Sequence, residues 1–430
     1  MYTKRNQDLD VSQTKGKEAT MISANYRTTN SISRMATKAV APALALVLVL
    51  AGCGTSSPGT SDKSQPSPTS TSLVVVAGNT MGSVPADASL FEDVIADAVQ
   101  TGGTIDVIVA DGSPQSALGG PQRNVGSTAA NEERRNKENA AITQQVVGAV
   151  QAARPDDAEA DVLSAISLAR RELVQDNAER KVVAVSASGL STCGLLDFTK
   201  EGMLMADPNE VADYYANKGE LPDLSGVDLV MYGIGDTCEP QESLSPASIN
   251  NLRTMWGALL EACGATVTIS DAAPSGVIED ELPNVTPVPV PSTDLFEAGQ
   301  DLPDSVELTE AVVGFLPDTA DYREPAQAMA VLKSVADQLK RSPNTTVRVV
   351  GSAASLPSDR EWALRLSTER ADAVATTLTA DCGVNSKRVT SLGIGDAEAE
   401  GVTRVNDLDQ DGVQIPELAV LNRKVTLFFK

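Results

Sequence analysis

Short apolar runs alternate with helical stretches between residues 73 and 270. Runs rich in β-branched residues predict strands at 73–78, 104–111, 181–188, 227–235 and 265–270. Between them, apolar residues recur every three or four positions, which predicts helices at 89–99, 132–153, 158–174 and 246–263. Strands that alternate with helices predict a parallel, doubly wound α/β sheet.

A second folded region follows a proline-rich stretch. Segment 272–304 contains the run PNVTPVPVPST, which predicts a linker or an extended segment. Beyond it, the predicted strands are 311–315, 346–352, 388–395 and 424–429, and the predicted helices are 324–341 and 360–380. This β-α-β-α-β-β order predicts an α+β domain with its helices on one face of the sheet.

The N-terminal segment carries an apolar stretch, 39–52, that ends directly before Cys53 in the string LVLVLAGC. A membrane-spanning helix needs about 20 residues, so this stretch is too short to be one. Small residues precede the cysteine, and basic residues lie upstream, among them Arg27, Arg34 and Lys38. This pattern resembles the signal peptide and lipobox of bacterial lipoproteins, which implies cleavage before Cys53 and a lipid on its sulfur.

On this interpretation, residues 1–52 are a signal peptide, with Met21 or Met35 as alternative starts. Residues 53–71 are rich in serine, threonine and proline and predict a flexible tether. The alternative is an ordinary apolar segment beside an unrelated cysteine.

Charge and composition narrow the class of function. The chain carries a net charge of -24, which argues against a nucleic acid or an anionic lipid surface as a partner. It contains no histidine, which excludes Ser-His-Asp and Cys-His catalysis and any His-ligated zinc site. No nucleophile motif stands in the right context, so we expect a protein that is not an enzyme.

Four cysteines follow Cys53. Cys193 and Cys238 each come after a predicted strand of the same parallel sheet, so both belong at its carboxyl edge and we predict a disulfide between them. Cys263 falls on the apolar face of helix 246–263 and is predicted to be a buried thiol. The alternative is a bridge between Cys263 and Cys382.

The C-terminal region, residues 305–430, resembles the OmpA-like peptidoglycan-binding family. The stretches that carry this resemblance are FLPDTA at 315–320, VRVVG at 347–351, LSTERADAV at 366–374 and NRKV at 422–425. The family fold is an α+β domain, in agreement with the predicted order of elements.

The resemblance implies a binding site. In the family, a carboxylate and an arginine clamp the zwitterionic end of a diaminopimelate side chain. Arg370 matches that arginine, but Ala354 stands where the family has its acid, and Ala363 stands where it has an asparagine. Asp359 or Glu361 could substitute, so we expect peptidoglycan binding that is weaker than is typical. The alternative is that Arg370 makes a surface ion pair only.

Residues 72–271 resemble the von Willebrand factor A domain, a Rossmann-like doubly wound fold. The family's ion-binding DTSGS sequence corresponds here to NTMGS at 79–83. Its later threonine and aspartate would fall at Ala160 and Ser188, so only Asn79 and Ser83 keep usable oxygens. We expect the scaffold without its metal ion, the alternative being another doubly wound domain.

An acidic stretch, Asp407, Asp409 and Asp411 followed by Gly412, resembles the start of a calcium loop. Position 12 of such a loop would be Leu418, so the bidentate carboxylate that encloses the ion is absent. We expect a solvated acidic loop that binds calcium weakly or not at all, and no other cofactor.

Together these features predict a lipid-anchored, extracytoplasmic protein of the cell membrane or outer membrane, which tethers or scaffolds at the cell wall. Its expected partners are the membrane, through the lipid, peptidoglycan, weakly, and an unidentified envelope protein. One alternative is a protein-interaction lipoprotein that does not bind peptidoglycan, and another is an envelope enzyme of unrecognised type.

Cys53→Ser removes the only sulfur that the lipobox offers for acylation. We expect the variant protein to leave the membrane fraction, because the lipid provides its attachment. Cell fractionation and the mass of the mature N-terminal peptide test this. Unchanged fractionation together with an unacylated wild-type peptide would contradict it.

Overall fold

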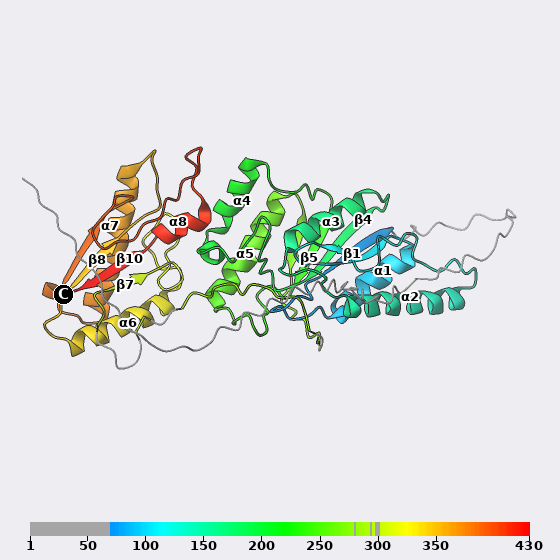
Figure 1. Ribbon diagram of the computed structural model, residues 1–430, viewed down its shortest axis with the longest axis horizontal. Coiled ribbons are helices and arrows are strands. Elements are labelled where there is room, and N and C mark those ends of the chain that lie inside the picture. Colours follow the sequence, from blue (N-terminus) through cyan, green and yellow to red (C-terminus); the bar gives the residue numbers. More distant parts are fainter. Residues whose placement is uncertain (1–68, 279–280, 293–294, 297–301) are drawn as a thin grey trace, which may run out of the picture. The chain divides into compact units, whose positions relative to one another are not determined.

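The computed structural model describes residues 69–278, 281–292, 295–296 and 302–430 (Figure 1). The predicted signal peptide, Cys53 and the tether up to residue 68 lie outside them. Across the described ranges, no helix is both long and apolar enough to cross a membrane.

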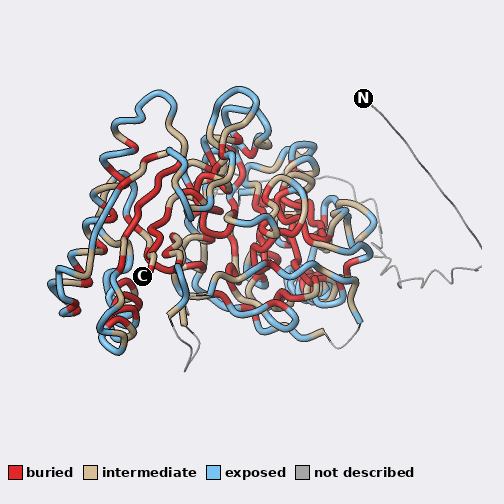
Figure 2. The backbone as a smooth tube through the Cα atoms, turned by 60° about the vertical axis from the view of Figure 1, so that its left-hand side comes forward, coloured by how far each residue is buried: buried red, intermediate tan, exposed pale blue. Residues whose placement is uncertain are grey.

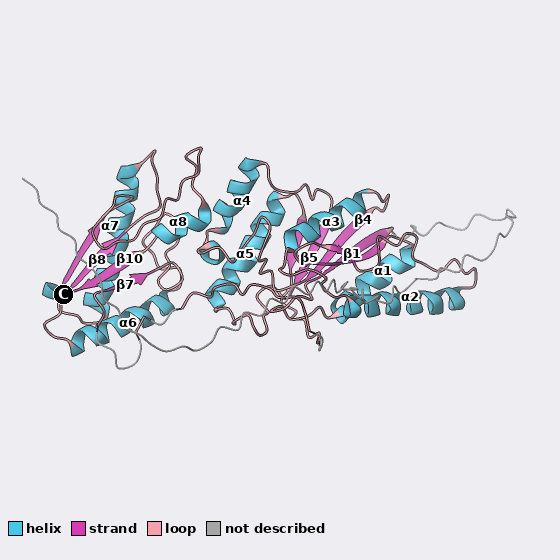
Figure 3. Ribbon diagram, viewed as in Figure 1, coloured by secondary structure: helices cyan, strands magenta, loops and turns pink. Residues whose placement is uncertain are grey.

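Six strands form the first sheet, in the order β3-β2-β1-β4-β5-β6 (Figure 3). All neighbouring pairs are parallel except β2 and β3, which are antiparallel. The strands are β1 (Thr71–Ala77), β2 (Ile105–Val109), β3 (Gln115–Ser116), β4 (Arg180–Ser186), β5 (Asp228–Tyr232) and β6 (Thr266–Ile269). The five predicted strands are confirmed, and the two-residue β3 was missed.

Helices cover both faces of this sheet. They are η1 (Ala88–Phe91), α1 (Glu92–Thr101), α2 (Glu132–Ala152), α3 (Val162–Val174), η2 (Met203–Met205), α4 (Pro208–Lys218) and α5 (Pro246–Ala262). Because side chains alternate along a strand, β1 contributes to two cores. Val74 and Val76 pack with α3, α4 and α5, whereas Leu73 and Val75 pack with α1 and α2. The predicted arrangement, a mostly parallel sheet with helices on both faces, is confirmed, and β1 is buried along its whole length. Figure 2 shows buried backbone in the interior of the molecule and exposed backbone around it.

The C-terminal region forms a separate four-stranded sheet in the order β7-β10-β8-β9. Strand β10 is antiparallel to β7 and β8, and β8 is parallel to β9. The elements are β7 (Ser305–Leu308), α6 (Pro325–Arg341), β8 (Val347–Gly351), α7 (Arg360–Thr376), η3 (Thr377–Asp381), η4 (Ser386–Arg388), β9 (Val389–Gly393), α8 (Pro416–Asn422) and β10 (Val425–Phe429). Helices α6 and α7 share one core with the sheet.

The predicted strand at 311–315 is wrong. The first strand of this sheet is β7, and Val312 and Val313 both donate backbone hydrogen bonds to Thr309 O, which makes a turn. The apolar run is nevertheless buried, because the turn directs Val312 and Val313 into the core. Helix α8 was also missed.

Two glycines let helix α7 approach the sheet closely. A Cβ at Gly351 would lie 2.1 Å from Ser367 O, and one at Gly393 would lie 2.2 Å from Thr368 Oγ1. The backbone of α7 therefore rests directly on the ends of β8 and β9. This contact fixes where the side chain of Arg370, one turn further along α7, enters the domain.

Part of the proline-rich stretch packs on the first domain. Residues 274–278 and 281–288, which we term the covering segment, contact the loops after β1 and β5 and the connection between α2 and α3. Val288 is buried in its core. The hydrogen bonds join Ser275 to Asp87, Thr286 to Glu159 and Val288 to Gln241.

A pair of carboxyl groups is packed between β2 and α3. Asp106 is fully buried, and Asp106 Oδ2 and Glu172 Oε2 are buried oxygens that accept no hydrogen bond from the described residues. Burial, followed by the hydrogen bond and the charge of Asp106, raises the pKa of Glu172 to about 8. A proton shared between the two carboxyl groups at neutral pH therefore gives each of these buried oxygens a hydrogen-bond partner.

Glu172→Gln should remove one source of pH dependence from the free energy of unfolding. The folded-state pKa of Glu172 lies above its ordinary value, so this group contributes stability that is present at low pH and is lost as pH rises toward about 8. Thermal melts of the full chain between pH 5 and 8.5 test this. We expect a flatter profile for Glu172→Gln than for the exposed control Glu179→Gln, and equal profiles would contradict the shared proton.

Candidate functional site

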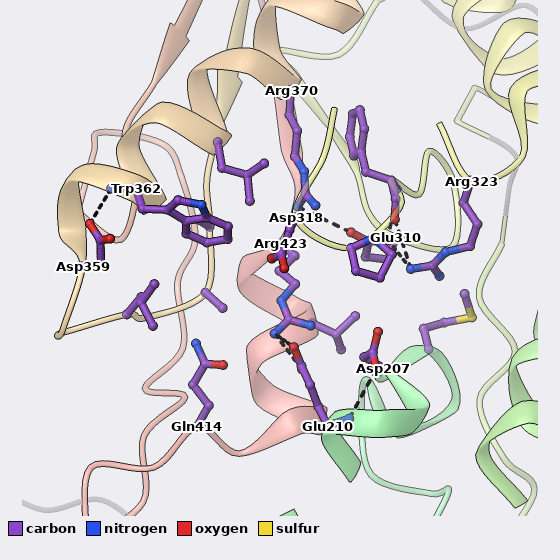
Figure 4. Close-up of a pocket in the computed structure, with 18 residues that line it drawn as sticks. Asp207, Glu210, Glu310, Asp318, Arg323, Asp359, Trp362, Arg370, Gln414 and Arg423 are labelled. Atoms are coloured by element: carbon purple, nitrogen blue, oxygen red, sulfur yellow. Dashed lines mark hydrogen bonds and ion pairs between the residues drawn. The ribbon is translucent and has the colours of Figure 1, made fainter. Parts of the chain in front are cut away.

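A cavity of about 450 Å³ lies at the end of β7, beside the N-terminal half of α7 (Figure 4). Charged side chains and two aromatic rings line it. They are Asp207, Glu210, Glu310, Phe315, Asp318, Arg323, Asp359, Trp362, Arg370 and Arg423. The cavity thus combines three guanidinium groups with five carboxylates.

Arg370 is held in place by the backbone of the turn 316–319. Its Nε donates to Thr319 O at 2.9 Å, and its Nη2 donates to Leu316 O at 3.3 Å. The guanidinium lies 5.0 Å from the centroid of the Phe315 ring, within the range of a cation–π contact. The structure therefore places the predicted ligand-binding arginine at the cavity, but buried, with 6% of its surface exposed.

Glu310 provides the buried carboxylate beside these arginines. Its carboxylate lies 3.4 Å from Arg323 and 3.9 Å from Arg370, and it accepts a hydrogen bond from Phe315 N. Burial raises the pKa of Glu310, and the positive charges of Arg323 and Arg370 oppose that rise. Burial also lowers the pKa of Arg370. Arg370 thus lies beside an acid, but the pair is buried rather than on the surface, and 3.9 Å is beyond hydrogen-bonding distance.

Residues 352–354, which begin the loop after β8, supply no acid. Ser352 donates its hydroxyl to Asn422 O, and Ala353 donates its backbone N–H to Gly395 O. Ala354 lines the cavity with a methyl group, as expected from the sequence. Ala363, at the family's asparagine position, is a fully buried residue of α7.

Asp359 lies at the cavity and caps helix α7. Its carboxylate accepts a hydrogen bond from Trp362 N at 2.9 Å, which satisfies a backbone donor in the first turn. Glu361, the other substitute considered, is exposed and does not line the cavity.

Arg423 is engaged by a carboxylate from the first domain. Its Nη2 lies 2.7 Å from both oxygens of Glu210, which belongs to α4. Lys218, two turns further along α4, lies 2.6 Å from Asp409 and 3.4 Å from Asp411. Three ion pairs, made by two side chains of α4, therefore join this helix to the C-terminal domain.

The acidic residues predicted to be a weak calcium loop do not converge. Asp407 is buried and accepts a hydrogen bond from Ser355 N. Asp409 accepts from the backbone N–H groups of Asp411 and Val413, and its other oxygen faces Lys218. In the described parts of the chain, no group of three or more acidic or cysteine side chains is arranged to hold a metal ion.

At the carboxyl edge of the first sheet, the candidate ion ligands have protein partners. Asn79 donates to Val150 O and Ala153 O and accepts from Ala86 N. The hydroxyl of Ser83 accepts from Ser188 N.

The structure does not join Cys193 to Cys238. Cys193 Sγ donates to Ala160 O at 3.6 Å, and Cys238 Sγ donates to Ser83 O at 3.3 Å, so the two thiols have separate partners. The predicted disulfide is therefore not formed in this structure. Cys263 is a buried free thiol, as expected, and burial raises its pKa to about 11. Cys382 is also a free thiol, buried in a different core, so the alternative bridge is not formed either.

Of the charged and aromatic residues that line the cavity, sequence reasoning identified only Arg370 and Asp359 as site residues; it missed the other eight, among them Glu310, Arg323 and Trp362. Glu310 and Arg323 come from irregular segments on either side of the turn 316–319, and no spacing in the sequence indicates that they meet. The string FLPDTA, which includes Asp318, was the one available signal.

Replacing Asp359 separates its structural role from any role in binding. Asp359→Ala should lower the free energy of unfolding by about 1 kcal/mol, because the first turn of α7 loses its cap. Asp359→Asn should retain most of this stability, since an asparagine oxygen also caps helices well. Urea unfolding of the full chain measures both, and equal stability of wild type and Asp359→Ala would contradict the capping role.

Comparison with known proteins supports the assignment of the C-terminal domain. Residues 315–410 match the OmpA family model. No curated protein matches the chain. Solved structures that resemble it include the OmpA-like domain of FopA1 from Francisella tularensis subsp. tularensis SCHU S4, with 19% identity over 29% of this chain and 71% of that chain and a TM-score of 0.22.

Two further structures give similar values. The peptidoglycan-associated lipoprotein from Burkholderia pseudomallei is 22% identical over 27% of this chain and 88% of that chain, with a TM-score of 0.21. The cell wall anchor of the T6SS from Pseudomonas aeruginosa is 25% identical over 29% of this chain and 81% of that chain, with a TM-score of 0.23. The match of residues 315–410 to the family model identifies the C-terminal domain as OmpA-like.

Proposed function

We propose that this protein is a lipid-anchored, non-enzymatic protein of the cell envelope, which contacts peptidoglycan through the cavity of its OmpA-like domain. The lipid on Cys53 would hold one end of the chain at a membrane, and the domain would hold the other end at the cell wall. The protein would then act as a tether or scaffold between the two.

The observation that carries this proposal is the state of Arg370. A guanidinium has five N–H donors, and two of them are used by the backbone carbonyls of Leu316 and Thr319. The remaining donors make no hydrogen bond within the described structure, and the residue lines the cavity. Arg370 is therefore oriented in advance and keeps donors for a ligand carboxylate.

For the first domain, we propose a von Willebrand factor A-like scaffold that binds protein without a metal ion. The hydrogen bonds of Asn79 and Ser83 support this, because the oxygens at the expected ion position already accept bonds from the backbone. The covering segment lies at the loops of the same sheet, which is where doubly wound folds bind their ligands.

The second candidate function is a protein-interaction lipoprotein that does not bind peptidoglycan. The contact between Glu210 and Arg423 favours it, because this protein carboxylate already occupies one of the three cavity arginines.

Arg370→Lys tests the proposed function. Lysine keeps the positive charge but loses the planar fork, so we expect affinity for purified sacculi to fall roughly tenfold, the equivalent of about 1.4 kcal/mol. Co-sedimentation of the full chain with sacculi measures this, with a thermal melt of each variant as a check on folding. The matched control is Arg365→Lys, an exposed position on the same helix, which should bind like wild type.

If wild type does not sediment with sacculi, peptidoglycan binding is wrong and the protein-interaction function stands. If wild type sediments and Arg370→Lys sediments equally well, the cavity is not the site of contact.

A further inference from the structure

Every second residue in one part of the covering segment is hydrogen-bonded to the first domain. Asn284 O accepts from Glu159 N at 3.1 Å, and Thr286 donates its backbone N–H and its hydroxyl to the two carboxylate oxygens of Glu159. The side-chain amide of Gln241 accepts from Val288 N at 2.7 Å and donates to Val288 O at 3.1 Å. In an extended chain, the backbone groups of alternate residues point to the same edge, so the first domain recognises one edge of a backbone.

The sequence of residues 284–291 suits this pattern of bonds. It reads NVTPVPVP, in which every second residue after Thr286 is a proline. Proline has no N–H, so the opposite edge of the chain lacks donors at these positions. Thr286 and Val288 each precede a proline, which restricts both of them to extended conformations. The segment therefore loses little conformational entropy when it is bound.

One side chain of this segment serves as an anchor. Val288 is 3% exposed and belongs to the core that α3, α4 and α5 share with the sheet, whereas Thr286, Pro287 and Pro289 are exposed. Bonds to the backbone of an extended peptide supply affinity, and a pocket for one of its side chains supplies specificity. The surface has both of these features of a peptide-recognition site.

The first domain itself holds the residues that make these bonds. Gln241 is 8% exposed, and its Nε2 also donates to Glu242 O. Ala160, which follows Glu159, donates its N–H to Thr192 Oγ1 and accepts from Thr192 N. Glu159 has a φ of 69°, in the left-handed region, and such conformations cluster at binding sites.

We propose that Glu159 and Gln241 form a peptide clamp, which residues 284–288 of the same chain occupy in place of a partner. The partner is an extended protein segment with alternating prolines and a hydroxyl residue two positions before a valine. This inference names the partner class for the protein binding proposed for the first domain, and it does not rest on the binding of peptidoglycan.

The covalent link determines how strongly the chain's own segment competes with such a partner. A ligand that is tethered beside its site has an effective concentration of roughly millimolar. A partner segment that is present at a lower concentration therefore binds weakly until residues 284–288 leave the clamp.

Val288→Asp should release these residues, because it places a charge in an apolar pocket. We expect the full-length variant to bind a labelled synthetic peptide of residues 282–291 roughly tenfold more tightly than wild type does, since the tethered segment no longer competes. The same peptide with aspartate in place of Val288 should bind neither protein. Fluorescence anisotropy measures the affinities. The matched control is Val277→Asp, which changes an exposed valine of the covering segment and should bind like wild type.

Gln241→Ala, added to Val288→Asp, tests the clamp itself. We expect the affinity for the peptide to fall roughly tenfold, because two hydrogen bonds to its backbone are lost. Glu242→Gln in the same background changes an exposed neighbour and should leave the affinity unchanged. A chelator should also leave it unchanged, because the clamp binds through side-chain and backbone groups alone.

A second measurement needs no substitution in the chain. At millimolar concentration, the peptide of residues 282–291 should displace the chain's own segment and expose the backbone N–H groups of Thr286 and Val288. Hydrogen exchange at these two amides should be faster with this peptide than with the peptide that carries aspartate.

Equal binding of the peptide by wild type and Val288→Asp, or equal exchange with both peptides, would show that the clamp does not accept a segment from another molecule. Sedimentation with sacculi should be the same for wild type and Val288→Asp. If the peptide experiments fail and sedimentation persists, the tether function stands without the clamp. If sedimentation fails and the peptide binds as expected, the clamp stands without the tether.

Discussion

The C-terminal site depends on the burial of one guanidinium. An isolated charge transferred from water into a protein interior is costly unless other groups replace its hydration. For Arg370 these groups are the carboxylate of Glu310, two backbone carbonyls of the turn 316–319 and the face of Phe315. They come from the segment after β7 and from the turn that follows it, whereas Arg370 belongs to α7. Satisfying one side chain therefore fixes the relative positions of three segments, and those segments form the walls of the cavity.

The carboxyl edge of the sheet in the first domain offers no such free donors. There, the polar side chains at the ends of the strands already form hydrogen bonds with the backbone, as Asn79 and Ser83 do. The covering segment adds further hydrogen bonds at the loops of this sheet. A buried polar group that already has its partners gains little from a ligand. The chemistry available to a small charged ligand is thus concentrated in the C-terminal domain.

Most of the fold could be predicted because it is encoded locally. Continuous apolar runs such as 73–78 and 181–188 are typical of strands buried on both faces, and both became central strands. The failures have physical causes. Strand β7 has only four residues, and the more apolar run 311–315 is buried as a turn instead. Helix α4 has few buried apolar residues and so has a weak periodic pattern.

The site was predictable only where a family motif marked it. The string LSTERADAV identified Arg370, and the loop after β8 showed that Ala354 replaces an acid. Glu310 and Arg323 could not be found in this way, because they meet through tertiary packing rather than through sequence spacing. Asp359 was identified as a candidate ligand, and the structure adds a capping role that its position before α7 explains.

A ligand carboxylate that binds Arg423 has to displace Glu210, which belongs to α4. Near the start of α4 the helix contributes an acid, Glu210, which pairs with Arg423. At its end the helix contributes a base, Lys218, which pairs with Asp409 and Asp411. This pattern favours one orientation of α4, since the opposite orientation would bring like charges together. The carboxylate of Glu210 is 40% exposed, and pairs of this kind contribute about 0–1 kcal/mol. A ligand carboxylate therefore needs only a small advantage to displace Glu210. In the proposed binding site, Arg370, which is buried and tied to the backbone, would be the fixed partner of such a ligand, and Arg423 would be the exchangeable one.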